Sequence, residues 1–440
     1  MTKWMALGAS VAALLLGCSD EKGGGAGLTG PGGGAAGGAG GVGGTAGSGG
    51  VGVTGGGGGG ALGGGSVGDA LLEGYGTDSS FGDGGEVCTV SNLDDAGSGS
   101  FRECVESRDT TDDSPTPRRV EFQVAGTITL ATDVRIRQPY LTIDGLSAPA
   151  PGITIAKTGD GTNGETIINT WPPNGTCGHD VLVQGIRFQG VWQGASEDHN
   201  QNAATIAIDG EDLPLCLKNV VLNRVTVVGA QDSGGDIWGS ATDVTVQYSA
   251  FLRSLHPNTY SHFPGGDADQ QRERISSHHN LYAYIHERGP QIRANVWDLN
   301  FEQNVMHQWD GFGFPGGYAT RVRCRNGACP QRVNVIENHW TSAGSNLSEA
   351  FVLGDASGPG DDGALPADVY MGGNRLPAEN VDAGAAASEF ARPAVAEVTL
   401  VADDQLVSQI LPLIGVPFRT SDEDALFAEV GSQIAAEIAR

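Results

Sequence analysis

The sequence is poor in cationic side chains and in long apolar runs. It has 25 Lys and Arg residues against 52 Asp and Glu residues, which gives a formal net charge of −27 at pH 7. This balance argues against a nucleic-acid partner, because phosphate binding depends on clustered cationic side chains. No apolar run reaches the roughly 20 residues that a membrane-spanning helix needs, so we expect no transmembrane segment.

Cysteine is also scarce, with 7 in 440 residues. No Cys-x-x-Cys pair or matching Cys/His spacing is present, which weakens the case for a zinc site. Six of the cysteines follow Cys18, and an even number in an exported chain predicts disulfides. Sequential pairing is the simplest arrangement, although the sequence does not prove it: Cys88 with Cys104, Cys177 with Cys216, and Cys324 with Cys329.

The first residues are typical of an export signal. Lys3 precedes an apolar stretch, Trp4 to Leu16, that is too short for a permanent membrane helix. The stretch ends in Leu-Leu-Gly-Cys18, which resembles the lipobox of bacterial lipoproteins and implies a diacylated Cys18 at the mature N-terminus. An ordinary signal peptide with a chance cysteine is the alternative.

A glycine-rich tract follows. Of the 71 glycines, 28 lie between Gly23 and Gly68, and such a segment buries too little apolar surface to offset its chain entropy. We therefore expect a signal at 1–18, a disordered linker at 19–75 and one folded domain at 76–440.

Short runs rich in β-branched residues dominate from Val87 onward. They include 121–124, 127–130, 141–144, 181–188, 220–228, 244–251, 275–282, 296–305 and 333–340. Several begin about 22 to 24 residues apart, which favours a coil of parallel strands over a hairpin sandwich with more frequent turns. Asn280, Asn304 and Asn338 recur late in these runs, where they either stack from coil to coil or cap their own turns.

Two amphipathic segments predict helices. Residues 99–108 place Phe101, Cys104 and Val105 on one side. Residues 421–440 begin with an N-cap Ser and carry an apolar side chain at every fourth position from Leu426. Because the ends of a coil expose unpaired strand edges, we expect one helix to cover each end.

Six segments carry a family resemblance in order along the chain. They are TVSNLDDAGSGSFREC (89–104), VEFQVAGTITL (120–130), LTIDGLSAPAPGITI (141–155), DSGGDIWGSATDVTVQYSAF (232–251), HHNLYAYIHERGPQIR (278–293) and GVPFRTSDEDALFAEV (415–430). Together they resemble the pectate lyase family of parallel β-helix polysaccharide lyases. The resemblance implies an all-β, right-handed parallel β-helix that cleaves a polyuronide by β-elimination.

The motif Arg288-x-Pro290-x-x-Arg293 is the sharpest chemical signature. β-Elimination removes the C5 proton beside a carboxylate, and the charge that develops must be neutralised. The resemblance implies that Arg288 is the base and that Arg293 grips the substrate carboxylate. Because arginine ordinarily stays protonated, this role requires an unusual environment or alkaline conditions. The alternative is that both arginines only pair with Glu287 and Glu273.

Asp232 and Asp236 match the paired aspartates of the family, which implies bound calcium. Calcium takes about six to eight oxygen ligands, and the third acidic ligand of the family is missing because Ala204 stands at its position. Glu197 and Asp198 on the preceding loop are the available substitutes. Turn-forming aspartates without a metal are the alternative.

The second departure from the family pattern, after Ala204, concerns a histidine. His256 stands where the family has a catalytic lysine, and it would hold the substrate carboxylate when protonated or act as a base when neutral. A core or loop histidine is the alternative, and His262 is a second candidate. His278 and His279 lie in a strand pattern, with one facing inward and one outward, and we expect them to be structural.

An acidic body repels an anionic polysaccharide at long range, so binding must rely on local arginines and divalent cations. The arginines proposed for this cluster are Arg272, Arg274, Arg288 and Arg293. Aromatic candidates for stacking on sugar rings are Trp238, Tyr260, Tyr282, Tyr284, Trp309 and Phe312, most of which we expect to pack in the interior.

These observations lead to one hypothesis and two alternatives. We expect a monomeric lyase of polygalacturonate or pectin, assisted by Ca²⁺ and held to the outer membrane or cell surface of a Gram-negative bacterium only through its lipid. One alternative is a tethered β-helix that binds polysaccharide without cleaving it, which Ala204 and His256 make credible. The other is a β-helix glycoside hydrolase, which usually needs clustered carboxylates that the arginine motif does not provide.

Overall fold

The computed structural model describes residues 72–107, 115–157, 166–171, 176–190, 206–209, 217–230, 234–239, 241–254, 259–261, 274–293, 296–309, 317–324, 329–341, 349–354, 368–377 and 397–439. All of them belong to one compact unit. None of the helices within these ranges is both long and apolar enough to cross a membrane. The described chain begins inside the expected linker, and Tyr75 is already buried, with 2% of its surface exposed.

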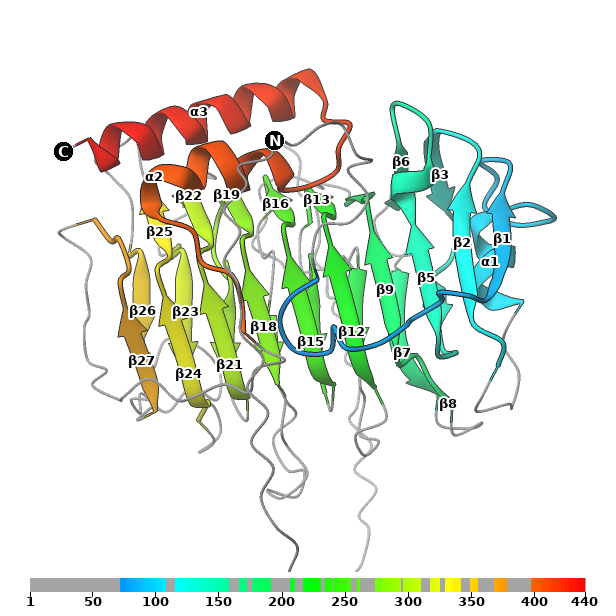
Figure 1. Cartoon of the computed structure of the whole chain (residues 1–440), viewed down its shortest axis with the longest axis horizontal. Helices are drawn as coiled ribbons and strands as arrows, with labels where there is room; N and C mark the ends of the chain where they lie inside the picture. Colours follow the sequence, from blue (N-terminus) through cyan, green and yellow to red (C-terminus); the bar gives the residue numbers. More distant parts are fainter. Residues whose placement is uncertain are drawn as a thin grey trace, which may run out of the picture. The chain divides into compact units, whose positions relative to one another are not determined.

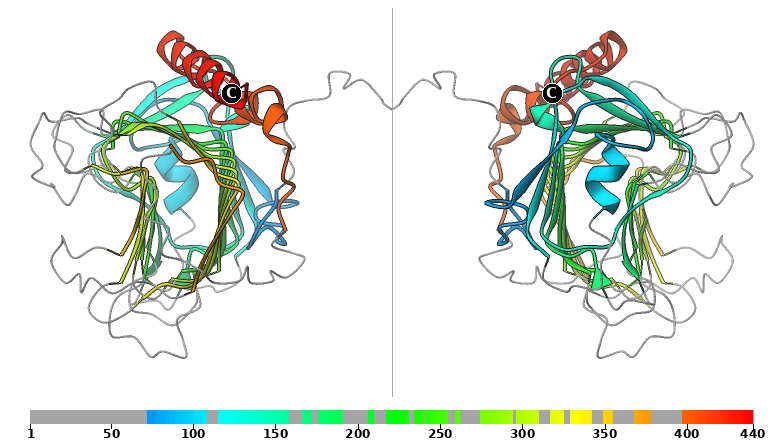
Figure 2. Two further views of the ribbon diagram at one scale, coloured as in Figure 1. Left: turned by 90° about the vertical axis from the view of Figure 1, so that its left-hand side faces the viewer. Right: turned by 90° about the vertical axis from the view of Figure 1, so that its right-hand side faces the viewer.

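Parallel strands form three sheets that wind around one interior (Figures 1 and 2). Sheet 1 contains β1 (Glu86–Val90), β2 (Arg118–Phe122), β5 (Leu141–Asp144), β9 (Val181–Gln184), β12 (Lys218–Asn223), β15 (Thr242–Gln247), β18 (Ile275–His278), β21 (Trp297–Glu302), β24 (Gln331–Ile336) and β27 (Val369–Gly372). Sheet 2 contains β3 (Gly126–Leu130), β6 (Ile153–Lys157), β10 (Ile186–Gln189), β13 (Thr226–Val228), β16 (Ala250–Leu252), β19 (Leu281–Ile285), β22 (Val305–Trp309) and β25 (His339–Thr341). Sheet 3 contains β4 (Val134–Ile136), β7 (Thr166–Trp171), β11 (Ile206–Asp209), β14 (Asp236–Trp238), β17 (Thr259–Ser261), β20 (Gln291–Arg293), β23 (Thr320–Arg323) and β26 (Phe351–Leu353), with β8 (Thr176–Cys177) antiparallel to β7.

The chain visits sheets 1, 2 and 3 in turn and then begins the next coil. Each strand therefore pairs in parallel with the strand one coil away, as β12 does with β9 and β15. The fold is a parallel β-helix, which confirms the predicted all-β class. Apolar side chains from all three sheets fill its interior, and Phe251 stacks on Tyr282 there with ring centroids 5.0 Å apart.

The corner between sheets 1 and 2 turns within two residues after β12, β15, β18, β21 and β24. One residue of each of these corners has a left-handed backbone: φ is, for example, 47° at Tyr248, 55° at His279 and 46° at Gln303. The predicted run 275–282 is thus two strands, β18 and β19, on different sheets. The other long runs bend in the same way, because a corner this tight interrupts the apolar pattern very little.

Asparagines stack along this corner, as the first of the two sequence readings anticipated. Asn280 Nδ2 donates to Asn304 Oδ1 at 3.0 Å, and Asn304 Nδ2 donates to Asn338 Oδ1 at 3.0 Å. Asn338 Nδ2 continues the series to Asn374 Oδ1 at 3.1 Å. Each side chain also accepts a backbone N–H from the preceding coil, as Asn304 does from Asn280 at 3.0 Å. The ladder satisfies buried polar groups that a tight turn leaves without strand partners.

The N-terminal end is closed by α1 (Phe101–Glu106), which lies inside the outline of the sheets in Figure 2. Its buried residues are the predicted Phe101, Cys104 and Val105. Ser100 caps the helix by accepting a hydrogen bond from Glu103 N at 3.1 Å. The predicted N-terminal capping helix is therefore confirmed.

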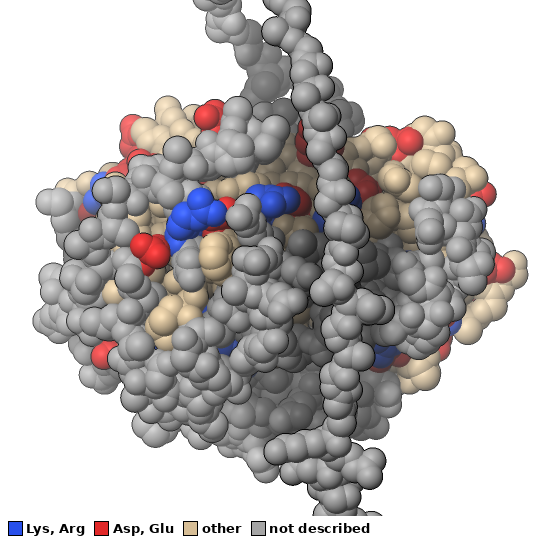
Figure 3. All heavy atoms as spheres, turned by 90° about the horizontal axis from the view of Figure 1, so that it is seen from below, with Lys and Arg blue, Asp and Glu red and all other residues tan. Residues whose placement is uncertain are grey.

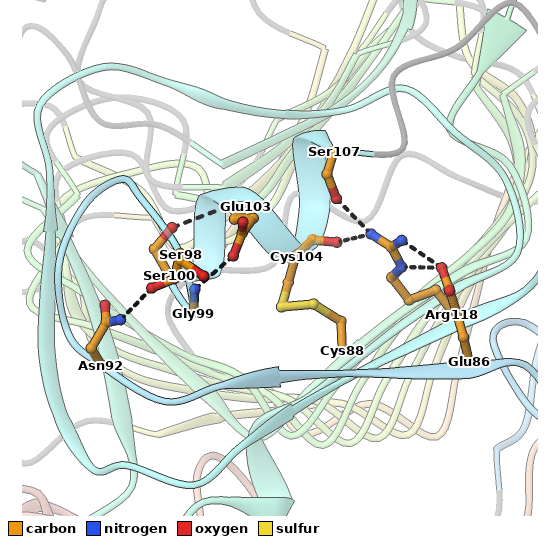
Figure 4. Close-up of a disulfide and its surroundings, with 10 residues drawn as sticks. All are labelled: Glu86, Cys88, Asn92, Ser98, Gly99, Ser100, Glu103, Cys104, Ser107 and Arg118. Carbon is orange, nitrogen blue, oxygen red and sulfur yellow. Dashed lines mark hydrogen bonds and ion pairs between the residues drawn. A yellow bond between two sulfur atoms is a disulfide. The ribbon is translucent and has the colours of Figure 1, made fainter.

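Two of the three predicted disulfides are present. Cys88–Cys104 joins β1 to α1, and Arg118 beside it donates to Cys104 O at 2.7 Å (Figure 4). Cys324–Cys329 closes a short loop after β23. The remaining pair is outside the described structure, because Cys216 and the side chain of Cys177 are not described.

The C-terminal helix differs from the expectation in its position. The final segment forms α2 (Asp403–Gln405), the π-helical turn η4 (Leu406–Ile410), the 3-10 turn η5 (Leu411–Leu413) and α3 (Ser421–Ile438); another 3-10 turn, η1 (Gly145–Ser147), follows β5. In Figure 1 α3 runs along sheet 2 rather than over the far end of the coil. Its N-cap is Thr420, which forms a capping box with Glu423.

Apolar packing explains this position of α3. Leu426, Val430 and Ile434 form a second core with outward-facing residues of sheet 2, such as Leu252 and Leu281. The expectation that α3 covers the far end is therefore wrong, because its apolar stripe matches an apolar outer face of sheet 2.

The outer face of sheet 1 is crossed by residues 72–85, which we call the N-terminal strap. It appears in Figure 1 as the blue segment running across the strands. Hydrogen bonds attach it to β15, β18 and β5 and to the residue before β9. They include Glu73 N to Gln247 Oε1 (3.0 Å), Tyr75 N to Ser276 Oγ (3.0 Å), Gly82 N to Thr142 Oγ1 (3.1 Å) and Ser79 Oγ to Asp180 Oδ1 (2.5 Å).

A second segment, 397–403, lies beside the start of the strap. Thr399 donates from its backbone N and its hydroxyl to the Glu73 carboxylate at 2.8 and 2.6 Å. Val401 N donates to Gln303 Oε1 at 2.9 Å. The strap and residues 397–403 therefore cover the same region of sheet 1.

Candidate functional site

Outward-facing side chains of sheet 3 form two rows. Ile237, Ile292 and Val322 are fully buried in the interior, so the residues before and after each of them point outward. The strand register gives a first row of Asp236, Gln291 and Arg321 and a second row of Trp238, Arg293 and Arg323, with β17 lying between β14 and β20. Adjacent strands are about 4.8 Å apart.

Arg293 ends β20 in the second row, and 8% of its surface is exposed. Its guanidinium carbon lies 4.6 Å from the centroid of the Trp238 ring on β14. The side chain therefore extends along the sheet across the intervening strand β17. This brings Arg293 to the strand that carries Asp236, two residues before Trp238.

Arg288 lies at the edge where sheet 2 turns into sheet 3. It has a left-handed backbone with φ of 62°. Three hydrogen bonds to the next coil hold the residues after it: Gly289 N to Ala319 O (2.8 Å), Thr320 Oγ1 to Gly289 O (2.7 Å) and Arg321 N to Pro290 O (3.1 Å).

The side chain of Arg288 is partly buried and pairs with an acid. Its side-chain exposure is 17%, and its Nε lies 3.1 Å from Glu287 Oε1. The pairing with Glu287 that the alternative predicted is therefore present. It involves an arginine that lies between β19 of sheet 2 and β20 of sheet 3. Arg293 is the last residue of β20, and Arg288 lies three residues before the first residue of that strand.

A polar cluster follows on the next coil, and the sequence analysis did not identify it. Gln291 Oε1 accepts from Tyr318 OH at 2.9 Å and from Arg321 Nη2 at 2.6 Å. The Arg321 guanidinium carbon lies 4.1 Å from the centroid of the Tyr318 ring. Burial raises the pKa of the Tyr318 hydroxyl, and Glu287 adds to this effect.

Arg323 adds a further cation in the second row, next to Arg293 in register. The alternation Arg-Val-Arg in β23 was the available signal for both outward arginines. The register therefore places Arg293, Arg321 and Arg323 on two adjacent strands of sheet 3 in an acidic protein. Figure 3, which views the molecule from below, shows Lys and Arg atoms with Asp and Glu atoms beside them on the described surface of that side.

Asp236 is the one predicted calcium ligand that the described residues include. It is in the first outward row, with 7% of its surface exposed. Within the described ranges no three acidic, histidine or cysteine side chains gather in a way that could hold a metal. One outward carboxylate beside arginines has the right donor chemistry for calcium but supplies only part of the oxygen shell.

Several predicted residues lie outside the described structure. They are Cys18, His256 and Asp232 of the primary hypothesis and Ala204, Glu197, Asp198, His262, Arg272, Glu273 and Phe312 of the surrounding argument.

Other predicted members of the site lie elsewhere. Arg274 pairs with Asp243 at the edge of sheet 1, so it does not join the arginines of sheet 3. Tyr260, Tyr282 and Trp309 are fully buried, which confirms that they pack in the interior. Tyr284 donates to Glu429 of α3 at 2.7 Å. Trp238 alone of the described aromatic candidates is on the outer face of sheet 3.

His278 and His279 are structural, but the expected alternation is wrong. Both are fully buried outside the coil interior, with their Nδ1 atoms 2.9 Å apart. His278 Nε2 is 3.1 Å from Glu73 O of the strap, and His279 Nε2 is 3.0 Å from Gln303 Oε1. The alternation fails because β18 ends at His278, and His279 occupies the left-handed corner.

Comparison with known proteins points to one group. No model of a known protein family matches the sequence. The chain is 31% identical over 284 residues to a probable pectate lyase C of Aspergillus flavus, a match that covers 64% of this chain and 56% of that protein. It is 29% identical over 283 residues to a probable pectate lyase C of Aspergillus terreus, with coverages of 64% and 56%. The chain thus spans little more than half the length of these relatives.

Solved structures share the fold. The major allergen of cedar pollen aligns with a TM-score of 0.56 at 13% identity, covering 78% of this chain and 92% of the allergen. A pectate lyase of a Bacillus species, solved in complex with trigalacturonate, aligns with a TM-score of 0.52 at 16% identity, covering 79% and 99%. Both support the parallel β-helix.

Proposed function

We propose that this chain is a polysaccharide lyase of the pectate lyase family that cleaves pectate-like polyuronides by β-elimination. The observation that carries the proposal is the contact of Arg293, the last residue of β20, with Trp238 on the strand that carries the outward Asp236. Arg288 lies three residues before the first residue of β20. The similarity to pectate lyases over 64% of the chain supports it.

The reaction needs a base and a counter-charge. Arg288 removes the C5 proton, the bond from C4 to the glycosidic oxygen breaks, a C4–C5 double bond forms, and the leaving oxygen takes up a proton. Arg293 donates to the carboxylate attached to C5, where a planar fork of N–H groups matches two oxygens and stabilises the enolate-like charge. Arg288 is ordinarily protonated, so we expect kcat to rise with pH.

Calcium completes the proposal. Asp236 and Asp232 would hold the ion, which when bound supplies positive charge next to the substrate carboxylate. Isothermal titration calorimetry with Ca²⁺ tests this without an activity assay. We expect the Asp236→Asn variant to bind at least about tenfold more weakly, since it loses one of two carboxylate ligands; equal affinity would exclude Asp236 as a ligand.

His256 is the proposed second group for the substrate carboxylate, in the position of the lysine of the resembling enzymes. A cationic imidazole exists only below about pH 6.5 unless its surroundings change its pKa. The His256→Lys variant should therefore bind substrate more tightly at alkaline pH than the unmodified protein does. A lower affinity in that variant would exclude this role.

Ultraviolet absorbance distinguishes the candidate activities. Elimination creates a conjugated unsaturated uronate, hydrolysis creates reducing ends without that absorbance, and a binding protein creates neither. We expect polygalacturonate to give the absorbance with the unmodified protein and not with Arg288→Ala, although both fold alike. Reducing ends without absorbance would support the hydrolase, and retention of polygalacturonate without either product would support the binding protein.

We further propose export and lipid attachment at Cys18, with the residues between Cys18 and the strap as a linker to a monomeric domain at the outer membrane or cell surface of a Gram-negative bacterium. The expected end of the linker at residue 75 is too late, because Glu73 and Tyr75 are already bonded to sheet 1. The disulfides Cys88–Cys104 and Cys324–Cys329 support an oxidising compartment. The test is detergent phase partition: the intact protein should enter the detergent phase and Cys18→Ser should not. Partition of both into water would exclude the anchor.

A further inference from the structure

Trp238 is an outward aromatic residue that the proposed chemistry leaves without a role. It ends β14, where Ile237 points into the interior and Trp238 therefore points outward. It is partly buried, unlike the aromatic residues of the core. It is also two residues beyond Asp236 on the same strand, so it lies beside the proposed metal ligand.

The contact of Trp238 with Arg293 spans two strand spacings. The register aligns Trp238 with Ser261 and Ser261 with Arg293, so the two backbones are about 9.6 Å apart. The guanidinium carbon is nevertheless 4.6 Å from the indole centroid. Arg293 must therefore lie along the sheet surface, with its charge over the face of the ring.

Such a contact orders the arginine without using its donors. An aromatic face attracts a cation through its electron density, most strongly when the pair is withdrawn from water, as Arg293 is at 8% exposure. The contact with the ring face does not itself use the guanidinium N–H groups, which donate in the plane of the group. A long side chain that is ordered before binding loses less rotamer freedom when it takes a ligand.

We propose that Trp238 is a positioning residue that holds the guanidinium of Arg293 in place for the substrate carboxylate. This inference rests on the proposed function, because it assigns Trp238 through Arg293. The proposal makes a specific chemical requirement. An aromatic ring at this position can hold the Arg293 guanidinium over its face, and an aliphatic side chain of similar bulk cannot.

The test is a double-mutant cycle on kcat/KM with polygalacturonate. We expect Trp238→Leu to lower kcat/KM about tenfold and Trp238→Phe to restore it to within about threefold of the unmodified protein. Arg293→Lys should cost more than Trp238→Leu. The double variant should then lose no more than Arg293→Lys alone, because Trp238 acts only through the guanidinium.

A matched control separates positioning from folding. Trp297, a partly buried tryptophan at the start of β21 on sheet 1, should leave kcat/KM unchanged when replaced by Leu. The melting temperature of every variant is measured alongside.

Each outcome has one meaning. Additive losses in the double variant, or no rescue by Trp238→Phe, would overturn the positioning role while leaving the function intact. Full activity of Arg293→Lys would overturn the proposed role of Arg293 itself. Since a lysine cannot reproduce a planar fork, that result would remove the premise of the Trp238 role and leave the lyase function standing. The function itself would be refuted if the unmodified protein did not cleave polygalacturonate by elimination.

Discussion

Sheets 1 and 3 are built from the same coils, but the side chains on their outer faces differ in charge and in what covers them. The outward residues of sheet 1 are mostly uncharged, and the chain's own terminal segments lie on them. Gln247 donates to Asn223, Asn223 to Gln184, and Gln184 to Asp144, so an amide series runs along the sheet. On sheet 3 the corresponding rows contain Arg293, Arg321 and Arg323.

The difference shows that the inner and outer faces of a coil are specified separately. Inward positions need only apolar volume, and both sheets meet that need with Val, Ile and Phe. Outward positions alternate with them along each strand. Their side chains can be amide, charged or apolar, and the parallel register lines them up in rows from strand to strand. In sheet 1 the outward polar groups are hydrogen-bonded to one another and to the strap. In sheet 3 the outward rows carry arginines, whose positive charge would attract an anionic polysaccharide.

The largest expected effect is on kcat, and it depends on which sheet loses an arginine. Arg288→Ala should lower kcat by about 10³-fold, because it removes the proposed base. Arg332→Ala is the matched control, since Arg332 has a similar left-handed backbone with φ of 57° but pairs with Asp298 at the edge of sheet 1. Steady-state ultraviolet assays measure both. Equal losses would mean that the two faces do not differ in function.

The asparagine ladder should matter for stability rather than for activity. Asn304→Ala removes the acceptor of two hydrogen bonds from Asn280 and the donor to Ser277 O. It should lower the free energy of unfolding by about 3 kcal/mol, because buried partners are left unsatisfied. Urea titration measures the change. Asn92→Ala, at an exposed turn, should cost less than about 1 kcal/mol; a similar cost for both would show that stacking contributes nothing.

Acid should open the covered face of sheet 1. Burial lowers the pKa of His278 well below its usual value and that of His279 to about 4, while Tyr248, Gln303 and the acidic Glu73 face the pair. The unfolded chain binds these protons below about pH 6.5. Stability from His279 is therefore complete above that pH and falls toward pH 4, by about 2 kcal/mol near pH 4.5.

Urea unfolding at neutral and acidic pH checks this expectation. His279→Asn, which suits a left-handed corner, should reduce the difference in unfolding free energy between the two pH values. An unchanged difference would show that His279 remains protonated in the folded state.

The smallest effect concerns the strap. A Cβ on Gly76 would lie 2.0 Å from Asp243 O, whereas Gly84 has a similar φ, +73° against +76°, and open space around it. Gly76→Ala should therefore cost about 1 kcal/mol more than Gly84→Ala, because both carry the backbone strain and only one meets sheet 1. Limited proteolysis within 72–85, together with urea titration, tests the difference. Equal costs would mean that the strap has room to move off the strands.

Sequence reasoning reached the features that repeat locally. The apolar side of α1 follows from the spacing of its apolar residues. The recurrence of Asn280, Asn304 and Asn338 left two interpretations open, stacking or capping, and the structure shows that they stack. The corners were not predicted because bulky residues such as Tyr248 and His279 occupy a left-handed backbone that normally favours glycine or asparagine. Without the corners, a run such as 275–282 cannot be divided between two sheets.

The strap and the cluster around Gln291 depend on contacts between distant coils. Residues 72–85 have the composition of a linker, and their attachment uses backbone groups whose partners are far along the chain, from 60 residues for Gly82 and Thr142 to 201 for Tyr75 and Ser276. Likewise, Gln291 and Tyr318 meet only because β20 and β23 pair in register. The motif around Arg288 could be recognised in sequence, but the contact of Arg293 with Trp238 required the stacking of three strands.

The attachment of the strap has a mechanical consequence. The chain enters the folded body at Glu73 and Tyr75, over β15 and β18 in the middle of sheet 1 rather than at an end of the coil. A pull applied at Glu73 would first load the hydrogen bonds that hold Glu73 and Tyr75 to β15 and β18, before any force reached the first strand. A body held in moving fluid by that end would resist unravelling from β1.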